Sequence, residues 1–199
     1  MPTTIVLRAV KGSKLNHAEM DANFSNLKTT ADAALPLAGG TLTGGLIGTT
    51  AAFSGKLSGA GTATNDNATA GQIGEYIEST IVSASAAALT TAVAQNVTSI
   101  SLTAGDWDVS GVVGFKSAAT TSITRLIASI SATTAAIDEI NSFYDAMAAT
   151  VPTAINQTRP VATTRVSVAA TTTIYLVASA TFTVAALSCF GKISARRVR

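Results

Sequence analysis

The sequence predicts a mainly β protein, an elongated homotrimer with three parts: a short N-terminal helix of coiled-coil type, a Gly-rich β shaft, and a C-terminal antiparallel β-sandwich of jelly-roll type. Three observations carry this prediction: a glycine-rich repeat, a heptad-like spacing of apolar residues before it, and alternating apolar residues in the second half of the chain. The predicted boundaries divide the 199 residues into 1–35, 36–72 and 73–199.

A seven-residue pattern occurs twice, with the copies eleven residues apart. Residues 42–48 (Leu-Thr-Gly-Gly-Leu-Ile-Gly) return as residues 53–59 (Phe-Ser-Gly-Lys-Leu-Ser-Gly). Such a unit cannot bury its own apolar face, and it gains stability by stacking on neighbouring units or on other copies of the chain. Because a solenoid usually needs at least three repeats, identical chains around a symmetry axis are the simplest source of the missing contacts. A flexible Gly-rich linker is the alternative.

The segment before the repeat carries the signals of a helix start. Asn16 and Glu19 have the spacing of a capping box, and Leu15 and Met20 have the spacing of a hydrophobic staple. Apolar residues then recur at alternating spacings of four and three: Met20, Phe24, Leu27, Ala31 and Ala34. This spacing predicts a coiled-coil seam about two heptads long, although an amphipathic helix on a globular body fits it as well. Pro36 ends the predicted helix.

The large apolar side chains of the seam and the repeat are the predicted trimer interface. They are Met20, Phe24, Leu27, Leu42, Leu46, Phe53 and Leu57. The composition favours such burial, because only 12% of the residues are charged, about half the usual share for a soluble domain. We therefore expect a polypeptide that lacks enough bulky interior to be stable alone and that completes its packing around a threefold axis.

Alternating apolar residues predict strands in 73–199. The clearest case has one face formed by Trp107, Val109, Gly111, Val113 and Phe115. Other strands are expected at 75–82, 123–131 and 186–198, and a β-prone arm at 3–10.

Two segments stay open between helix and strand or loop, namely 84–94 and 137–149. Residues 164–168 and 174–178 flank a turn-like segment and predict a β-hairpin. Several strands of this length, joined by loops, suggest the jelly-roll sandwich.

The charge pattern argues against nucleic acid and membrane partners. The net charge is only +2, and no stripe of Lys and Arg interleaves with aromatic residues. Arg196, Arg197 and Arg199 are expected to be a solvated strand end or ion-pair partners. The long uncharged stretches 79–105 and 166–191 are too rich in Ser and Thr to predict a membrane helix.

No catalytic, cofactor-binding or metal-binding residue is predicted. His17 and Cys189 are far apart in the sequence and cannot make a zinc site, and we expect Cys189 to be a buried, inert thiol. Asp106 and Asp108 could be the carboxylate pair of a glycosidase, but their alternation with Trp107 favours a solvated strand edge. Trp107 could stack on a sugar, but a place in the core fits its spacing better.

Four blocks of sequence resemble tail fibre proteins of tailed bacteriophages. Residues 10–27 (Val-Lys-Gly-Ser-Lys-Leu-Asn-His-Ala-Glu-Met-Asp-Ala-Asn-Phe-Ser-Asn-Leu) resemble the N-terminal segment of many of these proteins. Residues 35–44 (Leu-Pro-Leu-Ala-Gly-Gly-Thr-Leu-Thr-Gly) resemble their shaft motif. Residues 102–111 and the ending 191–199 resemble their C-terminal β domains.

The resemblance implies a homotrimeric virion protein that attaches a phage to the host cell surface. It implies docking on a tail or baseplate protein through 1–35, and contact with a host surface glycan or protein through 73–199. We expect shallow binding sites in the outer loops 116–122 and 141–160, with avidity from three heads, and we predict no individual receptor-binding residue.

Other functions fit the same residues. The chain could be a purely architectural baseplate, neck or head fibre, or an adaptor, without receptor binding. It could also be a surface-polysaccharide depolymerase, or a subunit of a phage-derived contractile particle.

Overall fold

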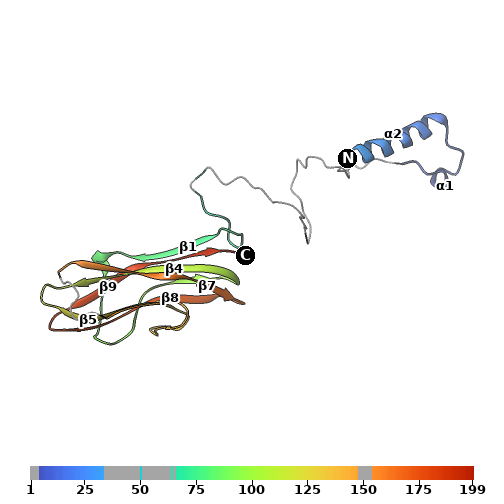
Figure 1. Ribbon diagram of the computed structural model, residues 1–199. Coiled ribbons are helices and arrows are strands. Elements are labelled where there is room, and N and C mark those ends of the chain that lie inside the picture. The colour runs from blue at the N-terminus through green and yellow to red at the C-terminus, as the bar shows by residue number, and fades with distance from the viewer. Residues whose placement is uncertain (1–4, 34–49, 51–63, 65, 148–153) are drawn as a thin grey trace. The chain divides into compact units, whose positions relative to one another are not determined.

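The structure, a computed structural model, describes residues 5–33, 50, 64, 66–147 and 154–199 (Figure 1). The chain divides into two compact units, Met1–Ala60 (unit 1) and Gly61–Arg199 (unit 2). The described residues form a mainly β protein with two antiparallel sheets and a short helical part. Most of the predicted shaft, 36–72, lies outside the described residues.

Unit 1 contains two helices, α1 (Arg8–Lys11) and α2 (His17–Ala33). The predicted capping box is confirmed: the Glu19 N–H donates to Asn16 Oδ1 at 2.8 Å, and the Asn16 N–H donates to Glu19 Oε2 at 2.8 Å. The β-prone arm predicted for residues 3–10 is wrong for residues 8–10. An isolated strand would have no partner for its backbone groups, whereas the N–H groups of Val10 and Lys11 donate to the Leu7 carbonyl.

In the described part of unit 2 the chain forms nine strands and one 3-10 turn. They are β1 (Tyr76–Ile81), η1 (Ser83–Ser85), β2 (Ala87–Ala88), β3 (Gln95–Leu102), β4 (Gly105–Ser117), β5 (Ser122–Ser131), β6 (Phe143–Met147), β7 (Asn156–Val168), β8 (Thr172–Thr183) and β9 (Leu187–Arg197). One sheet has the order β1-β9-β4-β7, with β2 also paired to β9 (sheet A), and the other has the order β3-β8-β5-β6 (sheet B).

The antiparallel pairs are nested along the sequence, and this nesting defines the fold. The first strand pairs with the last, β3 with β8, β4 with β7, and β5 with β6. Successive pairs of the nested series alternate between the two sheets, which lie face to face (Figure 1). Eight strands nested in this way in two sheets form a jelly roll, to which the short β2 adds a fifth strand in sheet A, so the predicted type of sandwich is confirmed.

The predicted hairpin at 164–178 is wrong. Both strands exist, but β7 pairs with β4 in sheet A, and β8 pairs with β3 and β5 in sheet B. The connection between β7 and β8 therefore crosses from one sheet to the other. Residues that favour a turn bend the chain, but they do not decide which strand it pairs with.

The two segments that the sequence left open contain mostly short elements. Residues 84–94 include the end of η1 and β2, and residues 137–149 include β6. The helical spacing within 137–149 is misleading, because Phe143–Met147 pairs along the edge of β5. The strands predicted at 75–82, 123–131 and 186–198 are confirmed as β1, β5 and β9.

A core of large apolar side chains fills the space between the sheets. The largest fully buried ones are Trp107, Phe115, Leu102, Ile123, Leu126, Ile174, Leu176, Leu187, Ile193, Val109, Val113 and Val177. The predicted inward face of residues 107–115 and the core position of Trp107 are confirmed. The expectation that the polypeptide lacks a bulky interior is wrong for unit 2, because this core is closed within one chain.

The jelly roll has two ends with different connections. At the proximal end, residues 66–75 lead into β1, and the β3–β4, β5–β6 and β7–β8 connections and the C-terminus lie beside them (Figure 1). At the distal end lie η1, residues 118–121 between β4 and β5, and residues 184–186 between β8 and β9.

Candidate functional site

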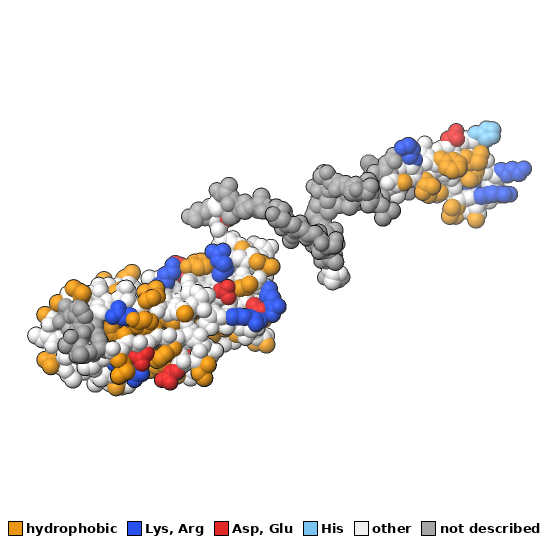
Figure 2. Space-filling model, viewed as in Figure 1, with side chains coloured by type: hydrophobic (Ala, Val, Ile, Leu, Met, Phe, Trp, Pro, Cys, Tyr) orange, Lys and Arg blue, Asp and Glu red, His pale blue; other side chains and the backbone are white. Residues whose placement is uncertain are grey.

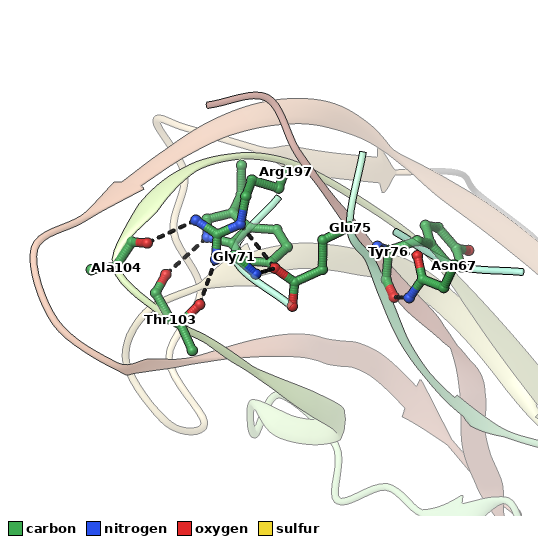
Figure 3. A network of polar contacts seen from close by, with 8 residues as sticks. Asn67, Gly71, Glu75, Tyr76, Thr103, Ala104 and Arg197 are labelled. Atoms are coloured by element: carbon green, nitrogen blue, oxygen red, sulfur yellow. Dashed lines mark hydrogen bonds and ion pairs between the residues drawn. The ribbon is translucent and has the colours of Figure 1, made fainter. Parts of the chain in front are cut away.

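Arg197, the last residue of β9, joins three separate segments at the proximal end (Figure 3). Its Nε donates to Glu75 Oε2 at 2.8 Å, and its terminal nitrogens donate to the Ala104 carbonyl oxygen at 2.8 Å and to the Thr103 hydroxyl. The side chains of Arg197 and Glu75 are only 5% and 8% exposed. This ion pair therefore acts as an internal clamp between the segment that leads into β1, the β3–β4 turn and the C-terminal strand.

Trp107 and Gly105 shape the space that the guanidinium occupies. Arg197 Cζ lies 4.3 Å from the centre of the Trp107 ring, a cation–π arrangement, and the indole N–H donates to the Thr103 carbonyl oxygen at 3.0 Å. Gly105 has φ +142, and a Cβ at this position would lie 2.1 Å from Arg197 Nη1. Only glycine at residue 105 leaves room for the clamp.

The Glu75 carboxylate stays ionised inside this network. Burial raises its pKa, but hydrogen bonds from the Gly71 N–H, at 2.8 Å, and from Arg197 outweigh burial. The net result is a pKa below the ordinary value for glutamate. A carboxylate held in this way has a structural role and is not suited to donate a proton at neutral pH.

Asp106 forms a second charged cluster at the proximal end. Arg165 Nη2 donates to both carboxylate oxygens of Asp106 at 2.9 Å, and Arg199 Nε donates to one of them. Hydrogen bonds from the Ser167 hydroxyl and from Arg165 hold the pKa of Asp106 well below its usual range. Figure 2 shows acidic and basic side chains side by side at this end of unit 2.

The expectation of a solvated strand edge is wrong for Asp106, which is 5% exposed, whereas Asp108 is exposed as predicted. Since two guanidinium groups hold the Asp106 carboxylate, it cannot supply the proton that a glycosidase acid donates. The ion-pair role expected for the C-terminal arginines is confirmed for Arg197 and Arg199.

A concavity of about 270 Å³ opens at the distal end, between η1 and the ends of β4 and β9. Its lining consists of Ser83, Ala84, Ala86, Lys116, Ser117, Ala118, Ala186 and Ser188. Lys116 is exposed and is the only charged residue among the described residues that line it. The Ser117 Oγ is buried without a hydrogen-bond partner among the described residues. We call this the distal pocket.

Val184 lies at the tip of the β8–β9 connection in a strained backbone conformation. Its φ is +79, and the Ala185 N–H donates to the Thr183 carbonyl at 3.1 Å, which closes a γ-turn. Positive φ is rare for a β-branched residue, and this form of γ-turn is strained. The Val184 residue is nevertheless 84% exposed, so burial of its side chain does not offset the strain.

The predicted outer loops lie only partly at the distal end. Residues 116–122 lie there and contribute Lys116, Ser117 and Ala118 to the distal pocket. Residues 141–160 run along β6 and into β7, and their middle part, 148–153, lies outside the described residues. Asn156, at the start of β7, lies opposite Lys116 in the sheet and donates from Nδ2 to Ser83 Oγ at 3.2 Å.

Three of the predicted trimer-interface residues lie in the described part of the chain, all on α2. Met20, Phe24 and Leu27 are 39%, 71% and 55% exposed. The other four, Leu42, Leu46, Phe53 and Leu57, lie outside the described residues. Apolar side chains are visible on the surface of α2 in Figure 2.

The clamp between Glu75 and Arg197 was missed by the sequence analysis, although one signal was present. Alternate residues of β9 point into the core, including Leu187, Ile193 and Ala195. Continuing this alternation places Arg197 on the buried face, where a charge requires a partner. The identity of that partner, 122 residues away, has no local signal.

Cys189 is buried as expected, and desolvation raises the pKa of its thiol to about 11, which makes it inert. Within the described ranges, no cluster of three or more His, Cys, Asp or Glu residues could bind a metal ion. No described helix is long and apolar enough to cross a membrane.

The sequence matches no protein-family model, and no curated protein is significantly similar to it. Among solved structures, the crystal structure of the infectious bursal disease virus VP2 subviral particle has a TM-score of 0.38 and 14% identity, covering 62% of this chain and 33% of that chain. Structures of the Gx and Gt strains of this virus have TM-scores of 0.36 and 0.35, with 14% and 16% identity. They cover 71% of this chain and 38% and 36% of their own chains. The chain thus spans about a third of the length of these proteins, and TM-scores this low carry no information about its function.

Replacing Arg197 by Met should destabilise unit 2 by about 3–5 kcal/mol, because the Glu75 carboxylate would stay buried without its partner. Arg196→Met is the matched control, since exposed Arg196 makes only a cation–π contact with Tyr76 and should cost about 0.5–1 kcal/mol. Urea unfolding followed by the fluorescence of Trp107 measures both. Equal losses in the two variants would refute the clamp.

Acid should also weaken unit 2. The pKa values of Glu75 and Asp106 are lowered in the folded state, so their contribution is complete above their unfolded pKa values and is lost as the pH falls through the folded ones. The free energy of unfolding should be level from about pH 7 to about pH 5 and fall below about pH 4.5. In the Glu75→Gln variant the free energy of unfolding should fall less steeply with decreasing pH. The same pH dependence in the variant and the unaltered chain would show that Glu75 does not contribute to it.

Replacing Val184 by Gly should stabilise unit 2 by about 1 kcal/mol, because glycine adopts positive φ without strain. Val82→Gly is the control, since Val82 is exposed in an extended conformation with φ −79 and should lose about 0.5–1 kcal/mol. Urea unfolding provides the comparison. Similar destabilisation of both variants would mean that Val184 is not strained.

Proposed function

We propose that this chain is the subunit of a trimeric attachment fibre of a tailed bacteriophage. Unit 1 assembles the trimer and docks it on the virion, and unit 2 is the head that contacts the host cell surface. The observation that carries the proposal is the contrast between the units: unit 2 closes its own core, whereas α2 has no buried residue in the described chain.

Helix α2 needs partners outside its own chain. It is 17 residues long, little above the length of about 12–15 residues below which isolated helices are marginal in water even for Ala-rich sequences, and most helical stability in proteins comes from packing of an apolar face. Its exposed apolar residues Met20, Phe24 and Leu27 are spaced by four and three, so they form one stripe. Copies of the same helix supply the complementary stripe, and a symmetric bundle buries all of them together.

A second apolar surface of unit 1 is available for docking on the tail or baseplate. Ile5, Leu7 and Val10 precede α2 and are 46%, 58% and 83% exposed. The Asn23 side chain fixes this segment against α2, accepting from the Val6 N–H at 2.8 Å and donating to the Val6 carbonyl at 2.9 Å. The segment is therefore held in place while its apolar side chains stay exposed.

The head suits contact with a host surface. The jelly roll is a fold used by lectin and viral capsid domains, and fold by itself does not decide function. At the proximal end a concavity of about 270 Å³ is lined by Asp106 and the two arginines that pair with it, and the distal end combines an open pocket with the strained, exposed Val184. Residues of this kind at loop tips mark binding surfaces more often than packing surfaces.

Three heads on one fibre would compensate for weak individual sites. Linking identical sites raises the effective concentration of the second and third, which increases the total affinity without new contacts. A purely architectural fibre would share the assembly of unit 1 but would not bind cells. The depolymerase alternative is disfavoured, because Asp106 is held by two arginines and cannot pair with Asp108 as an acid.

The fluorescently labelled full chain should bind saturably to bacteria of a susceptible strain within a panel. Phe24→Asp should dissociate the trimer, because it places charges along the α2 stripe, and cell binding should then weaken by about 10²-fold through loss of avidity. Sedimentation velocity and flow cytometry measure the two effects.

Ser25→Asp is the control, since it adds the same charge at an exposed position beside the stripe. It should leave both the mass and the cell binding unchanged. Absence of saturable binding to any strain would reject the attachment function in favour of the architectural one. Unchanged trimers of Phe24→Asp would reject the α2 bundle.

A further inference from the structure

We infer that the distal pocket binds the anionic group of a surface saccharide, with Lys116 as the counter-charge. This inference rests on the proposed attachment function and names the ligand class of the head. It is carried by the shape of the distal pocket, by the distribution of charge in unit 2, and by the hydrogen-bonding groups that the fold leaves unused there.

The distal pocket is small and accessible. The described residues that line it are serines, alanines and Lys116, with no large apolar or aromatic side chain among them, whereas protein interfaces depend on Trp, Tyr and Arg anchors. The volume of about 270 Å³ is below the range of roughly 300–1,000 Å³ for drug-sized ligands. These properties favour binding of one hydroxylated unit of a polymer over binding of a protein partner or of a large ligand.

Charge is distributed unequally between the ends of unit 2. No carboxylate is among the described residues that line the distal pocket. Two acidic strand residues of unit 2 are neutralised by partners: Asp145 on β6 accepts from Arg125 Nη2 at 2.6 Å, and Glu78 on β1 pairs with Lys192. Lys116 makes no ion pair with any described residue, so its charge is available to an anionic ligand.

A hydroxyl group in the same lining as Lys116 has a proton to donate. Ser83 Oγ accepts from Asn156 Nδ2 at 3.2 Å, which leaves its own proton for another acceptor. The Ser117 Oγ is unpartnered within the described chain but is buried, so it does not face a ligand. Carboxylates and phosphodiesters only accept hydrogen bonds at neutral pH, so they match a lysine beside a hydroxyl donor.

The test uses the full chain and three polymers. The probes are oligogalacturonate, which carries carboxylates, poly(glycerol phosphate), which carries phosphates, and neutral dextran. We expect calorimetry to detect binding of at least one anionic polymer and none of dextran, and added salt should weaken the binding. The two anionic probes distinguish a carboxylated from a phosphorylated ligand. Binding of dextran as tight as that of the anionic polymers would overturn the inference.

Variants of Lys116 show whether this pocket is responsible. Lys116→Gln should weaken binding by about tenfold or more, the loss expected for one charge-assisted hydrogen bond, and Lys116→Arg should restore most of it. Lys192→Gln is the control, since it removes the same charge from the same sheet, where Lys192 pairs with Glu78. Unfolding of each variant in urea confirms an intact fold. Equal binding by Lys116→Gln and the unaltered chain would overturn the inference.

The two proposals can fail separately. If the chain binds cells saturably but neither anionic polymer, the attachment function stands and the ligand assignment is wrong. If it binds an anionic polymer through Lys116 but no cells, the site stands and the attachment function is wrong.

Discussion

The position of β9 in the middle of sheet A is the constraint on which the rest of unit 2 depends. This strand, the last described in the chain, pairs with β1 on one side and β4 on the other, so β1, at the edge of the sheet, depends on β9 for its strand pairing. Its final residue, Arg197, then extends the pairing into the buried clamp with Glu75. Because a buried charge without a partner is costly, the clamp forms only when the proximal end is complete.

A division of roles between the two ends of the sandwich follows from this constraint. The proximal end uses its charged groups internally, in the clamp and in the Asp106 cluster, and little of their chemistry is left for a ligand. The distal end has no comparable network among its described residues, and Lys116 and the Ser117 hydroxyl stay uncommitted there. In the described part of unit 1 the apolar side chains of Met20, Phe24 and Leu27 are exposed, and the proposed function assigns them to contacts with other copies of the chain.

Sequence reasoning succeeded where a pattern is local and failed where the structure depends on distant pairing. Alternation from Trp107 to Phe115 correctly gave the buried face, and the spacing of Asn16 and Glu19 correctly gave the helix start, since both depend on backbone periodicity or on neighbours three residues apart. The hairpin at 164–178 failed because nested pairing overrides a local turn. Asp106 seemed solvated because its partners, Arg165 and Arg199, lie far along the chain.

The central claim is that the head is complete in one chain, whereas the N-terminal helix is completed by other copies. The most direct test is the mass in solution of the full chain and of residues 61–199, measured by sedimentation equilibrium at micromolar concentration. We expect three times the single-chain mass of 20.0 kDa for the full protein and a folded monomer for the fragment. A monomeric full chain, or a fragment that trimerises as tightly as the full chain, would contradict it.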